Sequence, residues 1–477
     1  MRRRLIPLCT ALVVVTAACS SADTDDTPAE VGSSSAPELD LVPADVDVVD
    51  FGAPPTVPEG DLAPALVADL DTVFGSLDTE IDTDAIAAVG RSGDARAAWL
   101  LTDLLRFVRP GSGASDGLVT AWEELTGRRA AGDGSAWGNT TNHLIAWDTP
   151  APPGYVDWKR QIFELVEPAW APFFDDDDAA IDWRWVSWGG VLIDDRPLDR
   201  TDLPCPEGCI PALNDPALTD ASGGDWYPDE RIVFGVVVDG EAVAFPKNIM
   251  EIHEMVNMTI AGRRIGMPYC TLCGSAQAYL TDDVAADVDL DGAETYELRT
   301  SGLLSRSNKV MYEFHSRSVF DTFTGEAVSG PLADAGVVLE QITVQTSTWG
   351  DWKAAHPDTR IVAEDGGIGR SYEEDPLRGR DDNGPIFPIG DVDPRLGVQE
   401  SVVGVITSDG TPVAFPVAAI EVVLASGDDV TLAGVQVRSD GGGFVAQDEA
   451  TGEPIAAHQS FWFAWSQFHP DTELWLP

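Results

Sequence analysis

The sequence predicts an α+β protein with a helical N-terminal domain followed by a β-rich C-terminal domain built from an internal duplication. Three observations lead to this expectation. Apolar residues recur at three- and four-residue spacing up to about Trp170. Short β-branched and aromatic runs, punctuated by Gly, Pro and Asp, begin at Trp183. Motifs of this second part then recur in the same order. We expect a helical domain at 61–182 and a β-rich domain at 183–477.

The N-terminus has the order of a secretory signal peptide. Arginines at 2–4 precede an apolar run at 5–15 that is too short to cross a bilayer. Small residues then lead to Cys19, as in the lipobox of bacterial lipoproteins, with Thr16 where Leu is usual. We predict a signal peptide at 1–19 with Cys19 lipidated, so the mature chain is extracytoplasmic and anchored to the cell membrane. An ordinary signal peptide and a secreted chain are the alternative.

A tether and a strongly acidic surface are predicted next. Residues 20–60 are rich in Ser, Asp, Ala and Pro and poor in aromatics, so we expect a disordered tether. The chain holds 80 acidic and 29 basic residues, a formal charge of -51. Such a surface repels phosphate backbones and excludes nucleic acid as a partner. The expected partners are the membrane, through the lipid anchor, and an envelope protein gripped by the helical domain.

The helical pattern is clearest at 62–70 and 95–108 and continues at 117–125 and 155–166. His143 lies among Trp137, Trp147 and Asn142, and we interpret it as a packed or hydrogen-bonded core histidine.

The β-rich part contains a duplicated unit. Apolar runs at 232–238 and 242–246 flank Asp239-Gly240, a hairpin pattern that returns around Asp409-Gly410. The motif Trp-x-x-Trp-x-x-x-His-Pro-Asp-Thr occurs at 349–359 and again at 462–472. We predict a first copy at about 231–360 and an abbreviated second copy at about 402–472. His356 and His469 occur in both copies, so we interpret them as structural.

The densest set of chemically capable side chains lies at 252–279, in the first copy alone. Cys270 and Cys273 form a Cys-x-x-Cys followed by Gly, the pattern of a knuckle in which two sulfurs converge. With Cys9 in the signal peptide and Cys19 lipidated, four cysteines remain, and three interpretations stay open. One is structural disulfides that pair Cys205 and Cys209 with Cys270 and Cys273. Another is a soft-metal site, and the third is a thiol–disulfide redox pair.

The metal hypothesis assigns copper or zinc to Cys270, Cys273, His253 and His315, because thiolates and imidazoles suit these ions. His253-Glu254 is not the start of a metalloprotease helix, since the residue four positions after His253 is Asn257. A basic cluster of Arg299, Arg306, Lys309 and Arg317 either receives an anionic ligand or forms salt bridges with the abundant carboxylates.

Six separated motifs between about 200 and 475 resemble the bacterial secreted family catalogued as domain of unknown function 3179. The motif residues match at His253, Glu254, Asn257, Cys270, Cys273, Ser301, Gly302 and Met311. The chain departs from the family at 319–322, where Val-Phe-Asp-Thr replaces the usual Leu-Trp-Ser-Gln. The resemblance implies a β-rich extracytoplasmic domain and no assigned activity.

Three functional hypotheses follow, and one of them is an interaction module whose helical domain grips another envelope protein. The first is a non-enzymatic binding protein with the Cys/His soft-metal site, in which His253, Glu254, Asn257, Ser301 and Met311 are the candidate residues around the ligand. The alternative is an enzyme acting on an envelope or carbohydrate substrate. Its proton-transfer groups would be His253 and Glu254, and its cysteines would be structural disulfides.

Overall fold

The computed structural model describes residues 49–130, 132, 134–198, 205, 208–285, 288–381 and 384–477. The predicted signal peptide, the lipidation site Cys19 and most of the predicted tether lie outside these residues. The last part of the predicted tether is described, and it packs against helices. The indole of Trp147 donates to the Phe51 carbonyl over 3.1 Å, and the Phe51 ring meets His143 at 5.2 Å. No helix in the described part of the chain is long and apolar enough to span a membrane.

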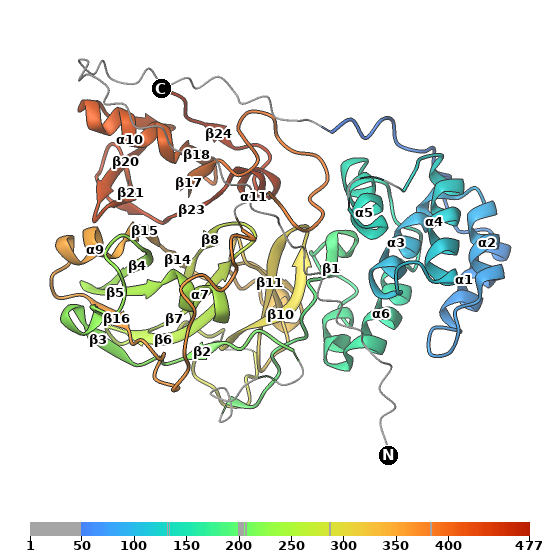
Figure 1. The fold of residues 1–477 in the computed structure, drawn as a ribbon, viewed down its shortest axis with the longest axis horizontal. Helices are drawn as coiled ribbons and strands as arrows, with labels where there is room; N and C mark the ends of the chain where they lie inside the picture. The colour runs from blue at the N-terminus through green and yellow to red at the C-terminus, as the bar shows by residue number, and fades with distance from the viewer. Residues whose placement is uncertain are drawn as a thin grey trace, which may run out of the picture. The chain divides into compact units, whose positions relative to one another are not determined.

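The N-terminal part is helical (Figure 1). Its helices are α1 (Pro64–Phe74), α2 (Thr83–Arg91), α3 (Ala98–Phe107), α4 (Gly113–Thr126), α5 (Ala136–Ala146) and α6 (Tyr155–Val166), followed by the 3₁₀ segment η2 (Pro168–Phe174). The side chains of Asp82, Ser112 and Ser135 cap three of these helices by accepting from amides of the first turn. His143 lies edge-on to Trp122 and Trp147, the packed environment that the sequence predicts.

The rest of the chain is β-rich, which confirms the predicted α+β class, and its described strands form five small sheets. Sheet A runs in the order β1 (Val186–Trp188), β10 (Leu298–Ser305), β11 (Asn308–Glu313), β12 (Val319–Asp321), β13 (Ala327–Ser329). Sheet B runs β14 (Gln341–Ile342), β9 (Ala278–Leu280), β7 (Arg263–Cys270), β6 (Met255–Ile260), β2 (Leu213–Asn214), with β8 (Ser275–Ala276) paired to β7. Sheet C runs β15 (Gln345–Thr348), β4 (Ile232–Val238), β5 (Glu241–Pro246), β16 (Arg360–Val362), β3 (Leu218–Asp220).

The last two sheets belong to the second copy. Sheet D runs β23 (Ala457–Phe461), β17 (Ser401–Ile406), β18 (Pro412–Pro416), β24 (Glu473–Leu474). Sheet E runs β19 (Val430–Leu432), β20 (Val435–Asp440), β21 (Gly443–Asp448), β22 (Pro454–Ile455). The remaining helices are α7 (Lys247–His253), α8 (Pro331–Asp334), α9 (Trp349–Ala355), α10 (Val417–Ser426) and α11 (Trp462–Phe468).

The strand pairings of the small sheets repeat within the β-rich part. Sheets C and D share one pattern, in which the first two pairings are antiparallel and the third, β5–β16 or β18–β24, is parallel. Sheets B and E also correspond, because β6-β7-β9-β14 and β19-β20-β21-β22 are both antiparallel meanders. Between β9 and β14 the first copy inserts β10 to β13, which are four of the five strands of sheet A. The insertion explains why the first copy is longer.

The repeated Trp and His motif makes the same packing contacts in both copies. The Trp352 indole donates to Thr359 Oγ1 over 2.9 Å, and the Trp465 indole donates to Thr472 Oγ1 over the same distance. His356 and His469 lie against these indoles, with ring centroids 4.1 and 4.3 Å apart. Both histidines therefore support the packing, as their presence in both copies suggests.

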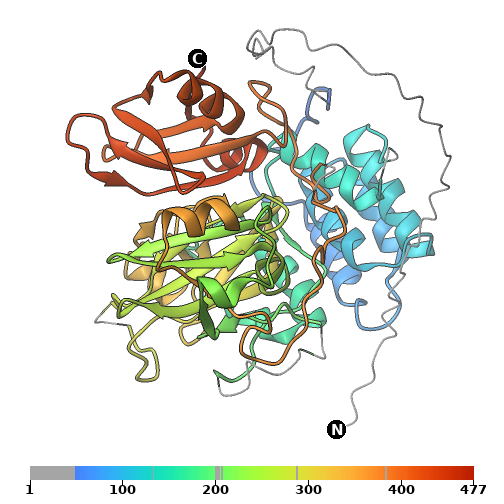
Figure 2. The same cartoon turned by 60° about the vertical axis from the view of Figure 1, so that its left-hand side comes forward.

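The helical part and sheet A share one hydrophobic core. Trp99, Phe163 and Phe173 from the helices belong to the same buried cluster as Leu303 and Tyr312 from β10 and β11. In addition, the indole of Trp170 donates to the Ser301 carbonyl over 2.7 Å. The helices are thus packed onto the inserted sheet, whereas the second copy packs on the first through β23, β15 and β8 (Figure 2).

The two copies are joined by a long connection that forms neither helix nor strand in its described residues, 363–381 and 384–400. We call these residues the strap. In Figure 2 the strap runs as an irregular orange chain along the first copy. The backbone amides of Ile389 and Gly390 donate to Asn142 Oδ1 of α5, each over 2.9 Å. The strap therefore contacts the helices as well as the β-rich part.

The repeated packing yields a prediction about two glycines. A Cβ on Gly404 would lie 2.0 Å from Trp465 Cζ3, and one on Gly235 would lie 2.2 Å from Trp352 Cζ3. Gly404→Ala and Gly235→Ala should each lower the free energy of unfolding by about 1 to 3 kcal/mol, the usual cost of overpacking. The measurement is urea unfolding of each variant. Gly113→Ala is the control, because a Cβ there meets nothing within 4 Å and Ala favours the helix. Equal stability of Gly113→Ala and Gly404→Ala would contradict the packing argument.

Candidate functional site

A cavity of about 220 Å³ contains the largest group of predicted site residues. Its polar lining residues are Glu251, Glu254, Cys270, Thr271, Thr300, Lys309, Arg380 and Asp381. Its remaining lining residues are Gly189, Val191, Ile210, Leu272, Gly302, Leu303, Leu304, Leu377, Ile386 and Phe387. A larger, more acidic hollow of about 690 Å³ lies at the start of α6 and holds none of the predicted site residues. The smaller cavity is therefore the candidate site.

The Cys-x-x-Cys forms a knuckle between β7 and β8. Gly274 adopts φ +58°, a left-handed conformation that lets the chain fold back under the sulfurs. The Cys273 amide donates to the Cys270 carbonyl over 3.2 Å. Both sulfurs lie near one acceptor, the Ser307 carbonyl, at 3.8 Å from Cys270 and 3.5 Å from Cys273. The two thiols thus converge as the sequence pattern predicts.

The two thiols differ in environment. Cys270 is 2% exposed and lines the cavity, whereas Cys273 is 0% exposed and is not among the described lining residues. Burial opposes ionisation of Cys270, but hydrogen bonds from the Cys273 thiol and from the Lys309 amide, at 3.4 Å, hold the pKa of Cys270 below its ordinary value. Burial and the neighbouring Cys270 raise the pKa of Cys273 well above its ordinary value. Of the two thiols, Cys270 therefore ionises more readily.

A buried ion pair lies beside Cys270. Glu254, the residue that ends α7, places Oε2 3.5 Å from Lys309 Nζ on β11. The same ammonium donates to the Glu254 carbonyl, and Thr271 Oγ1 donates to Glu254 Oε1 over 3.2 Å. Burial raises the pKa of Glu254 and lowers that of Lys309, while their mutual attraction opposes both shifts. This pair can hold or release a proton at the cavity wall.

A second group of charged side chains lies at the edge of the cavity, where the strap contacts α7. Lys247 Nζ lies 3.2 Å from Glu251 Oε1 and 3.0 Å from Asp381 Oδ2. Burial raises the pKa of Glu251 to about 7. Asp381 belongs to the strap, so this ion-pair group joins α7 to the strap at the edge of the site.

The prediction that His253 is a metal ligand is wrong, because both of its ring nitrogens have other partners. Its Nδ1 lies 2.8 Å from the Pro211 carbonyl, and its Nε2 lies 2.8 Å from the Tyr372 hydroxyl of the strap. Both ring nitrogens are thus engaged, and burial lowers the pKa of His253 to about 4. His315 is half-buried against Phe314. Among the described residues no three His, Cys, Asp or Glu side chains lie close enough to hold a metal together. The predicted ligand set of two cysteines and two histidines is therefore not assembled.

Three further candidates support the walls of the site. Asn257 Nδ2 donates to the Leu298 carbonyl over 2.9 Å and its Oδ1 accepts from the Leu298 amide, so Asn257 ties β6 to β10. Ser301 Oγ accepts from the Leu303 amide at a bulge in β10, where Gly302 adopts φ +80°. Met311 is buried in the core. None of the three is a lining residue in the described part of the chain, whereas Glu254 and Cys270 are.

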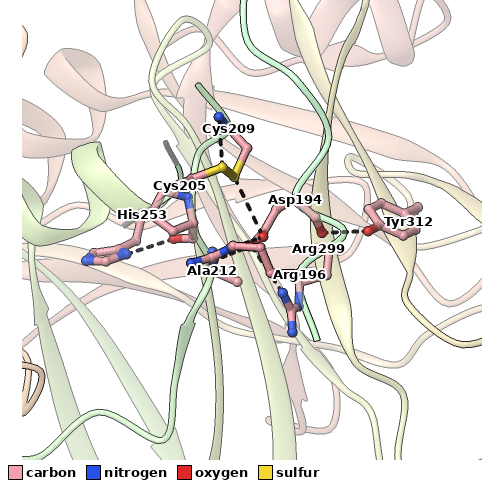
Figure 3. Close-up of a disulfide and its surroundings, with 9 residues drawn as sticks. Asp194, Arg196, Cys205, Cys209, Ala212, His253, Arg299 and Tyr312 are labelled. Carbon is pink, nitrogen blue, oxygen red and sulfur yellow. Dashed lines mark hydrogen bonds and ion pairs between the residues drawn. A yellow bond between two sulfur atoms is a disulfide. The ribbon is translucent and has the colours of Figure 1, made fainter. Parts of the chain in front are cut away.

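The predicted pairing between the two cysteine segments is also wrong. Cys205 and Cys209 are bonded to each other, while Cys270 and Cys273 are free thiols. Figure 3 shows that the disulfide lies beside Asp194, whose Oδ1 is 3.7 Å from Cys209 Sγ. The separation of only four residues favours the local pair.

Asp194 anchors the segment that carries this disulfide (Figure 3). Its carboxylate accepts from Arg196, over 2.5 Å, from the Ala212 amide, over 2.9 Å, and from Arg299, over 3.1 Å. Its carbonyl accepts from the Tyr312 hydroxyl over 2.6 Å. Burial opposes ionisation, but these partners hold the pKa of Asp194 below its ordinary value of 3.8.

The basic cluster expected from the sequence is divided among several partners. Arg299 pairs with Asp194 and Glu297, and Lys309 pairs with Glu254. Arg306 lies over Trp185, and Arg317 lies over Tyr312. The salt-bridge interpretation therefore holds for Arg299 and Lys309.

The lining residues from the strap, among them Leu377, Asp381 and Phe387, have no signal in the sequence, because the strap has no periodic pattern.

Replacing Asp194 should destabilise the protein in a pH-dependent way. Asp194→Asn removes one of the two carboxylates that pair with the buried Arg299 guanidinium and leaves Glu297 as the other. We therefore expect a loss of about 1.5 to 3 kcal/mol at neutral pH, the value of a hydrogen bond to a charged group. The pKa of Asp194 is lower in the folded state than its ordinary 3.8, so its charge stabilises the fold above that pH. The difference between wild type and variant should shrink as the pH falls below that value. Urea unfolding at neutral and acid pH measures this difference, with the exposed Asp78→Asn as the control. A difference that stays constant with pH would contradict the assignment.

Comparison with known proteins gives one match. A family model described as protein of unknown function (DUF3179) covers residues 207–472. Neither a curated protein nor a solved structure matches the chain. The matched range begins between Cys205 and Cys209 and includes both copies, the inserted strands β10 to β13 and the strap. Because the match covers more than half of the sequence, it confirms the resemblance carried by the motifs around His253, Cys270 and Ser301, and the protein belongs to the DUF3179 family.

Proposed function

We propose that this protein is a thiol-redox protein in which Cys270 and Cys273 cycle between dithiol and disulfide. The observation that carries the proposal is the asymmetry of the knuckle. Cys270 lines the cavity, whereas the neighbouring Cys273 is fully buried and is not a lining residue. A nucleophilic thiol at a cavity wall, with a second thiol close enough to hydrogen-bond to it, is the arrangement that two-electron thiol chemistry requires.

The surrounding groups have defined roles in this chemistry. Oxidation joins the two sulfurs, releases two electrons to the substrate and releases the protons that the thiols carry. The Lys309 amide stabilises the Cys270 thiolate by its hydrogen bond. The negative charge of Glu254 raises the pKa of both thiols, so Glu254 is close enough to act as the buried base that accepts a proton. Lys309 holds Glu254 in place.

The burial of both sulfurs restricts the substrate to small molecules. Cys270 is 2% exposed and Cys273 is 0% exposed, so a cysteine on a folded protein cannot reach either one. Access is through the cavity of about 220 Å³. We therefore expect the substrate to be a small oxidant or reductant and not a protein.

The proposed location is extracytoplasmic, with the chain anchored to the membrane by lipidated Cys19. This part of the proposal rests on the basic start, the apolar run and the small residues before Cys19. The Cys205–Cys209 disulfide is consistent with an oxidising compartment. The envelope partner of the helices stays a prediction.

A second candidate function is binding of copper(I) by the same two thiolates. It is favoured by the convergence of both sulfurs on the Ser307 carbonyl. Soft thiolates select copper(I), and a copper(I) ion with two thiolates carries one net negative charge that the nearby Lys309 would offset. This proposal keeps the soft metal and replaces the imidazole ligands with two-coordinate sulfur.

The redox proposal predicts unequal thiol reactivity. In the reduced protein, iodoacetamide should alkylate Cys270 before Cys273, because Cys270 alone of the two lines the cavity. Mild oxidation should join Cys270 to Cys273, as read by peptide mass mapping. Replacing both Cys205 and Cys209 with Ser is the control and should leave these rates unchanged. Equal alkylation rates, or failure of the knuckle to form a disulfide with any small oxidant, would contradict the proposal.

The copper proposal predicts a defined stoichiometry. Reduced protein should retain one copper(I) per chain on equilibrium dialysis, and both Cys270→Ser and Cys273→Ser should lose it. His315→Gln is the matched control and should retain the ion. Loss of copper from the control, or failure of the wild type to retain copper, would contradict the proposed copper binding.

A further inference from the structure

We infer that the oxidant of the Cys270–Cys273 pair is an organic hydroperoxide of low molecular weight. This inference rests on the proposed redox function and names its substrate class. Three properties of the cavity carry it, namely its size, the character of its walls, and the contiguous polar groups at Cys270.

The size of the cavity favours small oxidants. At about 220 Å³ the cavity is smaller than the roughly 300 to 1,000 Å³ of ordinary ligand pockets. A cavity of this size favours a hydroperoxide with a short alkyl or phenyl-sized group over a peptide disulfide such as glutathione disulfide.

The walls of the cavity favour a neutral and partly apolar molecule. Aliphatic and aromatic side chains from three regions face it, including Ile210, Leu303, Ile386 and Phe387. The lining carboxylates Glu251, Glu254 and Asp381 are balanced by the lining cations Lys309 and Arg380 and by Lys247, which pairs with Glu251 and Asp381. The cavity therefore has no excess positive charge for an anionic thiol or disulfide, and the formal charge of the protein, -51, disfavours the approach of an anion.

The polar groups at Cys270 match the steps of peroxide reduction. The Cys270 thiolate attacks the terminal oxygen of the hydroperoxide, and the O–O bond breaks. The alkoxide that leaves takes up a proton to become an alcohol, and Cys270 becomes a sulfenic acid. The hydrogen-bonded group of Thr271, Glu254 and Lys309 can hold the proton that Cys270 lost and return it at this step.

The second thiol completes the reaction. Cys273 attacks the sulfenic sulfur, the S–O bond breaks, and the oxygen leaves as water with the proton of the second thiol. The net reaction converts one hydroperoxide and two thiols into one alcohol, one water and one disulfide. A small dithiol, entering through the same cavity, reduces the disulfide by exchange and is itself oxidised to a disulfide.

The test compares oxidants on the reduced full-length protein. Cumene hydroperoxide, hydrogen peroxide, glutathione disulfide and a water-soluble quinone are each mixed with it, and formation of the Cys270–Cys273 disulfide is timed by quenching and mass mapping. Cumene hydroperoxide should react at least about tenfold faster than hydrogen peroxide, since even one extra methylene in an apolar pocket is worth that factor. It should also react faster than the disulfide and the quinone. Cys273→Ser should stop at a sulfenic acid that dimedone traps, and Cys270→Ser should not react.

A matched pair of variants tests the role of the apolar wall. Ile386 lines the cavity and is 45% exposed, whereas Ile406 is 38% exposed and lies outside the lining on β17. Ile386→Ser should reduce the ratio of the cumene hydroperoxide rate to the hydrogen peroxide rate, and Ile406→Ser should leave that ratio unchanged. Equal ratios in the two variants would overturn the assignment of the apolar wall to the substrate.

The outcomes separate this inference from the redox function on which it rests. If the knuckle forms its disulfide faster with the quinone or the small disulfide than with the hydroperoxide, the substrate class is wrong and the redox function stands. If none of the oxidants forms the Cys270–Cys273 disulfide, both fail.

Discussion

The site depends on one buried ion pair, between Glu254 and Lys309. Glu254 ends α7 in the first copy, and Lys309 lies on β11 of the inserted sheet. A buried charge without its partner costs several kcal/mol, so the two segments have to stay together. The same strand brings the Lys309 amide to 3.4 Å from Cys270 Sγ. One interaction therefore joins the inserted sheet to the first copy and also positions the group that stabilises the thiolate.

Comparison of the two copies separates the scaffold from the candidate site. Both copies have the same Trp, Thr and His packing, so that packing is scaffold. Only the first copy has the insertion that supplies Lys309 and the knuckle that supplies the thiols. The second copy still supports the knuckle, because the Phe461 amide donates to the Cys273 carbonyl over 2.8 Å and the Phe461 ring lies against Gly274. A copy without reactive groups thus buries the sulfurs of the other.

Local spacing in the sequence reveals some residues of the site and does not reveal others. Cys270 and Cys273 are three residues apart on a turn, so their convergence follows from the pattern alone. His253 looked equally suitable because it is close in the sequence. The structure turns it toward Pro211 and Tyr372, while its neighbour Glu254, in a left-handed conformation, faces the cavity. Consecutive residues at a helix end point in different directions, and only the packing around the helix decides which one meets the thiols.

By itself, the sequence determined the α+β class, the duplication and the knuckle. These follow from periodicity, from repeated motifs and from covalent spacing, all of which act over short distances along the chain. The tertiary structure decided which charges pair, which sulfur meets the cavity and which strap residues close it. These outcomes depend on contacts between segments far apart in the chain, with separations of 39 residues for Cys270 and Lys309, 55 for Glu254 and Lys309, and 134 for Lys247 and Asp381. The physical reason is that a buried charge is stabilised only by the partner that the whole fold brings to it, and no local pattern encodes that partner.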